Sequence, residues 1–258
     1  YFELREMLQY NNWTIEQTEW LPEEEAAIEQ QLTFSNDYLC QTAHFEEYYS
    51  HPQRLHTYIK GVEKPILNIS DISVRLHDER LDLGEWEVKD FYRCLHKNRP
   101  LLERRFTATS PKGATLRVHA KRQLIPQQEL MLLEYEISSV DYTGPISLLA
   151  MLGESRGMPD WYPLMNHLGK DQCWMWLQLH DIDMQLCYAM QWQVLHNGFP
   201  IEQRPIKIEK PHTIGYSLTT KIKAGDTCLL RKCVSVVDSR NHKKENLIAD
   251  ALACLTNL

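Results

Sequence analysis

The sequence predicts a mainly β protein, one large antiparallel β domain with a short helix near each end. Three observations lead to this prediction. Apolar and polar residues alternate along much of the middle of the chain, turn signals separate the alternating runs, and helical spacing of apolar residues is confined to two segments near the ends. A chain of 258 residues without an internal repeat or a low-complexity linker can form one such domain.

The predicted strands follow from a period of two. Apolar and polar residues alternate over 72–76, 116–121 and 184–194, so we expect these strands to be buried on one face and wet on the other. The runs 131–137 and 228–237 are apolar on more than one face, which is typical of strands inside a packed sandwich. Pro-Lys-Gly, Thr-Gly-Pro and Ala-Gly-Asp sequences mark turns between the runs.

Two segments have helical patterns. Leu21-Pro22 precedes three glutamates and then Ala26 to Ile28, which places proline and acidic residues in a favoured first turn. Near the other end, apolar residues recur at helical spacing from Leu247 to Leu255. This second stripe needs a partner surface, so we expect more protein to follow it.

Charge and hydropathy argue against two classes of partner. The 28 Lys and Arg residues stand against 35 Asp and Glu, a formal net charge of −7 that repels a phosphate backbone. The basic pairs Arg104-Arg105 and Lys121-Arg122 are too local to form a nucleic-acid footprint. No run approaches the roughly 20 apolar residues of a membrane helix. We therefore predict no nucleic-acid partner and no membrane span.

Seven cysteines are scattered along the chain without a C-x-x-C motif, and no signal peptide is visible. Free and mostly buried thiols in a reducing compartment are the simplest interpretation, so we predict a cytoplasmic protein. Because the chain begins at Tyr1 rather than Met, a periplasmic or secreted protein that has lost an upstream segment stays open as an alternative.

Two motifs resemble catalytic or metal sites and lack the necessary context. Residues 153–157 read G-x-S-x-G, but Pro159 and the following loop-like residues replace the helix that a nucleophile elbow requires. His44, Glu47 and His51 have a spacing that could hold a metal if the segment were helical. A solvated polar face is the simpler interpretation of these three residues, and we predict no metal site.

Glu134 and Glu136 lie two apart on a predicted strand and so point to the same face. Two carboxylates that flank a glycosidic bond could act as acid and base, but two solvent-facing glutamates paired with Lys121 or Arg117 are the simpler interpretation. We predict no catalytic residue in this chain.

Aromatic residues offer the better candidates for contact with sugar. Trp174 and Trp176 share a strand face and are more typical of a core, whereas Trp161-Tyr162 falls in a predicted loop. Asp160, Trp161 and Tyr162 are therefore the candidate substrate-binding residues, at the rim of a sugar site.

Several motifs in this chain are similar to those of the N-terminal domain of glycoside hydrolase family 65, which includes maltose, trehalose and kojibiose phosphorylases. The chain has Trp13 and Ile15 where the family has Trp-x-Ile, and 57–62 reads Thr-Tyr-Ile-Lys-Gly-Val against T-Y-I-x-G-V. The stretch from Glu29 to Glu47 aligns without a gap to E-S-x-F-S-x-x-N-G-Y-L-G-x-R-G-x-F-E-E, with matches at Asn36, Tyr38, Leu39, Phe45, Glu46 and Glu47.

Later parts of the chain extend the resemblance. Leu95, Leu102 and Arg104 parallel L-D-x-x-x-G-x-L-x-R, and Arg122 fits the arginine of R-x-x-S. The stretch 222–236 resembles the last strands of the family's domain. The similarity is strongest over 13–153 and weak over 154–215.

The chain also departs from the family pattern. The family's glycines and its Arg-Gly pair are replaced by Asp37, Cys40, Thr42 and Ala43. These changes alter local backbone freedom and remove a guanidinium, so the resemblance indicates a divergent member whose substrate is open.

The resemblance implies a galactose mutarotase-like super-sandwich over 1–240 and the start of a helical linker over 241–258. A catalytic (α/α)6 domain of the same polypeptide would follow, carrying the catalytic glutamate and the phosphate site. The expected activity of the parent is phosphorolysis or hydrolysis of an α-glucosidic disaccharide, without a cofactor and with inorganic phosphate as co-substrate of a phosphorylase. A homodimer is a further expectation. This domain would support the barrel and its active-site rim.

Two alternatives stay open from the sequence. A stand-alone carbohydrate-binding or mutarotase-like module would need a concave, aromatic-lined groove with histidine and carboxylate side chains. A plain interaction domain would use the apolar helix at 247–255 as its contact surface.

Overall fold

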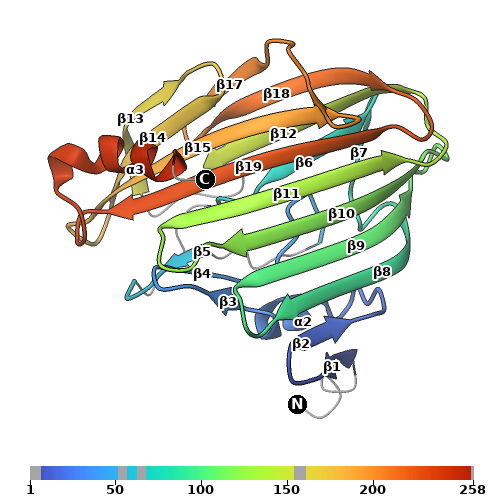
Figure 1. Cartoon of the computed structure of the whole chain (residues 1–258), viewed down its shortest axis with the longest axis horizontal. Coiled ribbons are helices and arrows are strands. Elements are labelled where there is room, and N and C mark those ends of the chain that lie inside the picture. Colours follow the sequence, from blue (N-terminus) through green and yellow to red (C-terminus); the bar gives the residue numbers. More distant parts are fainter. Residues whose placement is uncertain (1–6, 52–56, 63–67, 154–160, 257–258) are drawn as a thin grey trace.

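The structure is a computed structural model that describes residues 7–51, 57–62, 68–153 and 161–256. Two antiparallel sheets face each other, with a third small sheet and a helix at one side (Figure 1). Every strand pair among these residues is antiparallel, as the alternating patterns predicted. The predicted mainly β fold is therefore confirmed.

The large sheet of the described residues has 11 strands. Its order is β1 (Gln9–Tyr10), β2 (Thr14–Gln17), β8 (Glu87–His96), β9 (Leu101–Thr109), β10 (Thr115–Leu124), β11 (Leu130–Ser139), β19 (Thr227–Asp238), β15 (Gln185–His196), β14 (Gln172–Leu179) and β13 (Trp161–Leu168), with β16 (Phe199–Pro200) paired to β15.

The second sheet lies behind the large one and has the order β17 (Ile206–Lys210), β18 (Thr213–Ile222), β12 (Gly144–Gly153), β6 (Ile72–Leu76) and β7 (Glu79–Arg80). The third sheet is β3 (Phe34–Ser35), β4 (Leu39–Gln41) and β5 (Thr57–Ile59). Within the described ranges, the helices with defined bounds are α2 (Glu25–Gln31), the 3-10 turn η1 (Lys244–Asn246) and α3 (Leu247–Leu255). The sequence predicted α2 and α3.

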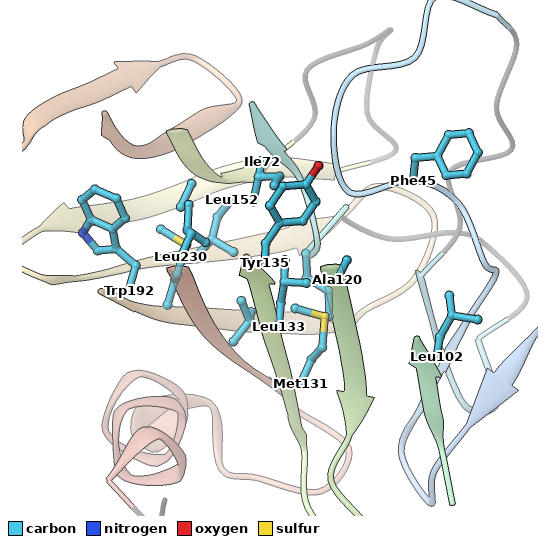
Figure 2. Packing of buried hydrophobic residues seen from close by; sticks show 14 of the residues in the cluster. Phe45, Ile72, Leu102, Ala120, Met131, Leu133, Tyr135, Leu152, Trp192 and Leu230 are labelled. Atoms are coloured by element: carbon cyan, nitrogen blue, oxygen red, sulfur yellow. The ribbon is translucent and has the colours of Figure 1, made fainter. Parts of the chain in front are cut away.

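The core lies between the two main sheets. Figure 2 shows Tyr135, Leu133 and Leu230 of the large sheet pointing toward Ile72 and Leu152 of the second sheet. Each of these side chains is at most 3% exposed. Burial on this scale contributes about 1.5–3 kcal/mol for each large apolar side chain and is the main force that holds the sheets together.

Lys232 also joins the two sheets from a fully buried position. It extends from β19, and its Nζ donates to the carbonyl oxygens of Asp71 (2.8 Å) and Met151 (2.6 Å). Burial lowers the pKa of Lys232 to about 7, against the opposing effects of Asp71 and Cys173. The amine therefore has two hydrogen-bond acceptors, but its buried position disfavours the protonated, charged form.

Helix α3 covers part of the outer face of the large sheet (Figure 1). Its buried residues Leu247, Ala251 and Leu255 pack in one cluster with Cys187 and Ala189 of β15. The prediction of a wet face along 184–194 is therefore wrong at Cys187 and Ala189, because α3 lies over them. The partner surface that the helical stripe required is the large sheet of the same chain.

Polar contacts fix the position of α3 as well. The hydroxyl of Ser235 donates to the carbonyl oxygen of Ala251 (2.6 Å), and His242 lies between the carboxylates of Glu129 (2.7 Å) and Asp250 (2.9 Å). Burial opposes the charged imidazole, but the two carboxylates outweigh it and raise the pKa of His242. None of the described helices is long and apolar enough to cross a membrane.

Candidate functional site

Three arginines project from neighbouring strands into the interior of the sandwich. Arg93 of β8 lies directly opposite Arg104 of β9, and Arg122 of β10 lies opposite Leu102, two residues along from Arg104 on the same face. Each arginine is at most 2% exposed. Buried guanidinium groups require carboxylate partners and saturated hydrogen bonds, because desolvation of an unpaired charge is costly.

Arg104 is paired with two adjacent glutamates. Its Nη1 donates to Oε1 of Glu47 (2.6 Å), and its Nη2 donates to both Glu46 and Glu47. The hydroxyl of Tyr135 adds a third donor to Glu47 at 3.2 Å. Burial alone would raise the pKa of Glu46, but Arg104 and Arg122 outweigh it and hold this pKa below its ordinary value.

Arg93 joins the first helix to the sheet. Its Nη1 and Nη2 donate to the two carboxylate oxygens of Glu25 in α2, at 2.7 and 2.8 Å, and its Nε and Nη2 donate to Gln17. A further bond reaches the carbonyl oxygen of Ala43 at 2.9 Å. Burial raises the pKa of Glu25 despite this pairing, since the carboxyl is almost completely shielded from water.

Arg122 connects the same region to the segment that precedes β6. Its Nη1 lies 3.0 Å from both His44 Nε2 and Ser70 Oγ, and its Nη2 donates to the carbonyl oxygens of Thr42 and His44. The hydroxyl of Ser70 continues the network to Asn68 at 3.0 Å.

This network overturns the predicted solvated face of His44 and Glu47. The two side chains are 1% and 2% exposed, because Arg122 and Arg104 compensate for their loss of water. His51, the third residue of the proposed triple, stacks on Tyr49 instead. In the described ranges, no group of three or more His, Cys, Asp or Glu side chains is placed to hold a metal ion.

The sequence itself carries a signal for the buried arginines. Arg122 continues the alternation of Leu116, Val118 and Ala120, so the period of two places it on the apolar face. Arg104 similarly shares a face with Leu102 and Phe106 in β9. A cation on the buried side of a strand predicts a buried carboxylate opposite.

The candidate rim residues fall at the beginning of β13. Trp161 is 2% exposed and meets the ring of His212 edge to face at 5.5 Å. Tyr162 is 43% exposed, and its ring centroid lies 5.3 Å from that of His180. The predicted loop is therefore wrong for Trp161 and Tyr162, which pair with Leu179 and Gln178 of β14. Asp160 lies outside the described residues.

Gly153 is the described part of the G-x-S-x-G motif, and residues 154–157 lie outside the described residues. It ends β12 with a φ of +125°, and a Cβ at this position would lie 2.1 Å from the carbonyl oxygen of His212. Only glycine fits such a position without strain. The glycine therefore has a structural reason that is independent of a catalytic serine.

The remaining candidates lie on the outer face of the large sheet. Glu134 pairs with Nε of Arg231 in β19 at 2.9 Å, rather than with Lys121 or Arg117 as expected. Trp174 and Trp176 are half-buried and pack against the cluster beneath α3. The tryptophan pair is thus a support for the helix, in line with the core-like interpretation of its spacing.

Comparison with known proteins identifies the family. The sequence matches the glycosyl hydrolase family 65 N-terminal domain over residues 15–258, and the chain belongs to this family. A solved structure titled "Putative kojibiose phosphorylase from human microbiome" superimposes with a TM-score of 0.84 at 17% sequence identity, covering 97% of this chain. This likeness establishes the super-sandwich fold. The chain spans 36% of the length of that protein.

A second solved structure, titled "Crystal Structure Analysis of HI1317", gives a TM-score of 0.34 at 8% identity over 90% of this chain and 96% of the other. None of the curated proteins matches the sequence.

The structure also explains the departures from the family pattern. Asp37, Cys40 and Ala43 stand where the family has glycines. None of the three has a positive φ, so the loss of glycine causes no backbone strain there. Thr42 stands where the family has an arginine, and its hydroxyl donates to Oε1 of Glu29 at 3.0 Å. The chain therefore has a neutral hydroxyl at this position, and it contacts the carboxylate of Glu29.

Proposed function

We propose that this chain is the non-catalytic N-terminal domain of a glycoside phosphorylase or hydrolase that acts on an α-glucosidic disaccharide. Its role is to support a catalytic (α/α)6 domain of the same polypeptide and to contribute to the rim of that domain's active site. The observation that carries the proposal is the family match over 15–258, together with a structural relative that is almost three times as long.

The structural role rests on how rigidly α3 is held. This helix occupies 247–255, within the segment expected to begin a linker, and both apolar packing and the Ser235–Ala251 hydrogen bond attach it to the large sheet. A helix fixed in this way gives whatever follows it a defined starting position and direction. The sandwich would therefore hold the catalytic domain in one orientation rather than on a flexible tether.

The chemistry would take place in the catalytic domain. A carboxylic acid there would protonate the glycosidic oxygen while phosphate, or water activated by a second carboxylate, attacks the anomeric carbon with inversion. No cofactor is required, and inorganic phosphate is the co-substrate of a phosphorylase. The buried arginines of the sandwich have no part in this step, because each is at most 2% exposed and already paired.

Tyr162 is the described side chain of the candidate rim that a substrate could reach, since Trp161 is buried. An exposed tyrosine presents both a ring face and a hydroxyl, which suits a sugar at the edge of a pocket.

Two measurements test the proposal. The chain alone is expected to release neither glucose nor glucose 1-phosphate from maltose, trehalose or kojibiose, with or without phosphate; turnover by the chain would overturn a non-catalytic role. In the parent protein, Tyr162→Ala is expected to lower kcat/KM for the disaccharide. Met165→Ala is the matched control, since Met165 also lies on β13 and is exposed to a similar degree (52% against 43% for Tyr162). Equal effects of the two changes would argue against a rim role for Tyr162.

A further inference from the structure

The edge of the large sheet is interrupted beside β15. The pairing of β14 with β15 stops at Gln172–Gln191, and that of β16 begins only at Leu195. The gap is bracketed by two backbone hydrogen bonds, from Trp192 N–H to the carbonyl oxygen of Asp171 (3.2 Å) and from Ile201 N–H to that of Val194 (3.0 Å). Gln193 lies between them. We call this interruption the notch.

Residues 201–205 cross from the large sheet to β17 of the second sheet at the notch, and they help to enclose a cavity of about 680 Å³. The part of its lining that belongs to the outer face of the large sheet comes from three strands: Leu132 and Glu134 of β11, Arg231 and Cys233 of β19, and Gln191 and Gln193 of β15. A cavity of this size falls within the range of roughly 300–1,000 Å³ that is typical of small-molecule sites.

One wall of the cavity is rigid. Trp192 is stacked on Tyr216 with an interplanar angle of 4° and a centroid distance of 5.4 Å. The hydroxyl of Tyr216 donates to the carbonyl oxygen of Gln172 at 2.5 Å. These contacts join β15, β18 and β14 around the notch, so this wall exists before any ligand arrives.

Most of the polar side chains that line the cavity have no hydrogen bond or ion pair with another described residue. Glu134 and Arg231 pair with each other. The other polar side chains make no side-chain hydrogen bond or ion pair within the part of the chain that the structure describes. They are the three amides Gln191, Gln193 and Gln203 and the four charged groups Lys170, Asp171, Glu202 and Arg204. These seven donor or acceptor groups line one cavity, where Gln191 is half-buried and the other six are open to solvent and available to a ligand.

The charges of the lining cancel. Glu134, Asp171 and Glu202 stand against Lys170, Arg204 and Arg231, which gives three carboxylates and three cations. A fourth cation nearby, Lys207, already donates to the carbonyl oxygen of Leu168 at 2.6 Å. A balanced field of this kind favours a neutral ligand, because an ion would be attracted and repelled from different sides of the cavity.

The donor and acceptor types narrow the ligand further. Each glutamine offers both an acceptor oxygen and two N–H donors, and each carboxylate accepts, a combination that matches hydroxyl groups that donate and accept. Trp192 is 6% exposed and stacked on Tyr216, so it offers no free ring face and a ligand in the cavity would be held by polar contacts rather than by stacking. We propose that the notch cavity binds a neutral saccharide of one or two pyranose units, through hydroxyl contacts to Gln191, Gln193 and the charged groups around them.

This site does not depend on the proposed function. The notch lies beside the β13–β14 turn at Lys170 and Asp171, whereas Tyr162 lies at the other end of β13. At about 3.3 Å per residue, the strand from Tyr162 to Leu168 separates the two by roughly 20 Å. Failure of the rim proposal would leave the notch proposal standing, and the reverse also holds.

The test is calorimetric titration of the 258-residue chain with maltose. Binding is expected, and Gln191→Ala and Gln193→Ala should each weaken it by roughly three- to tenfold, the usual effect of losing one hydrogen bond. The matched control is Gln123→Ala, a glutamine on the outer face of β10 that is outside the cavity and should leave binding unchanged. All three positions face outward, so the fold should survive each change.

Three results would overturn the proposal. Maltose could give no heat up to roughly 10 mM, beyond the weak end of specific binding. Gln123→Ala could weaken binding as much as Gln191→Ala, which would place the sugar elsewhere. Glucose 6-phosphate could bind more tightly than glucose, which would replace the neutral saccharide by an anion. Tighter binding of glucose than of its phosphate would support the balanced cavity.

Discussion

Arg104 and Glu47 form a two-point ion pair in the interior of the sandwich, with Arg104 on β9 and Glu47 in the segment that follows β4. Each charge is nearly inaccessible to water, and 57 residues of sequence separate them. The pair therefore attaches an early, irregular segment to the middle of the large sheet. Glu46, Arg122 and Tyr135 belong to the same hydrogen-bond and ion-pair network. Removal of Arg104 or Glu47 would therefore leave several buried polar groups without a partner.

Loss of the Arg104 guanidinium is expected to destabilise the chain strongly. Arg104→Met leaves Glu47 and Glu46 buried with fewer donors, and breaking a buried pair from one side costs about 3–5 kcal/mol. The free energy of unfolding from urea titration measures the effect. Arg105→Met is the control, because this neighbour points outward and is largely exposed. A loss below about 1 kcal/mol for Arg104→Met would show that the network adapts.

Gly153→Ala is expected to destabilise the second sheet. The φ of +125° is poorly accessible to alanine, and its Cβ would clash with the backbone of His212. Strain of this type costs about 1–3 kcal/mol before the clash is counted. Gly113→Ala is the control, since Gly113 also has a positive φ (+90°) but has open space around it. Equal unfolding midpoints in thermal denaturation of the two variants would contradict the role of the clash at Gly153.

The strands of this fold were predictable because their burial follows a simple period. The alternation over 116–121 becomes the inward and outward faces of β10, and the apolar stripe from Leu247 to Leu255 becomes α3. Local spacing was sufficient for both, since each element hides one face against a larger surface.

The sites were less predictable because they depend on contacts between distant segments. The face of His44 and Glu47 was expected to be solvated, and nothing in their own segment indicates that Arg122 and Arg104 meet them. Cys187 and Ala189 read as a wet face for the same reason, since the helix that covers them lies some 60 residues later. The notch is also a tertiary feature, because it forms where the pairing of β15 with β14 has ended and its pairing with β16 has not begun.

Shortening Leu247 is expected to loosen α3 from the sheet. Leu247→Ala removes a fully buried side chain at the start of the helix, and substitutions of this kind cost about 2–5 kcal/mol. Fluorescence of Trp174 and Trp176 should shift to longer wavelength, because both pack in the cluster under the helix. Leu252→Ala, on the less buried side of α3, should have a smaller effect on both stability and emission. An unchanged emission maximum in Leu247→Ala would contradict docking through this residue.

Lys232 is expected to make the stability of the chain increase with pH above neutrality. Burial lowers its pKa to about 7 in the folded state, whereas an unfolded lysine titrates near 10.4. Between these values the unfolded chain binds more protons than the folded chain, so raising the pH favours folding by up to about 1.4 kcal/mol per unit. Below about pH 7 both states are protonated and the contribution becomes flat.

The measurement is urea denaturation from pH 6 to pH 9.5 in the original chain and in Lys232→Met, compared as a difference. His242, whose pKa is raised, contributes stability that is lost as the pH rises through its folded pKa, but it is present in both proteins and cancels. Lys232→Met keeps a long side chain between the sheets and removes the titrating amine. The original chain should therefore approach or pass the variant in stability as the pH rises; parallel pH profiles would show that Lys232 keeps its proton in the folded chain.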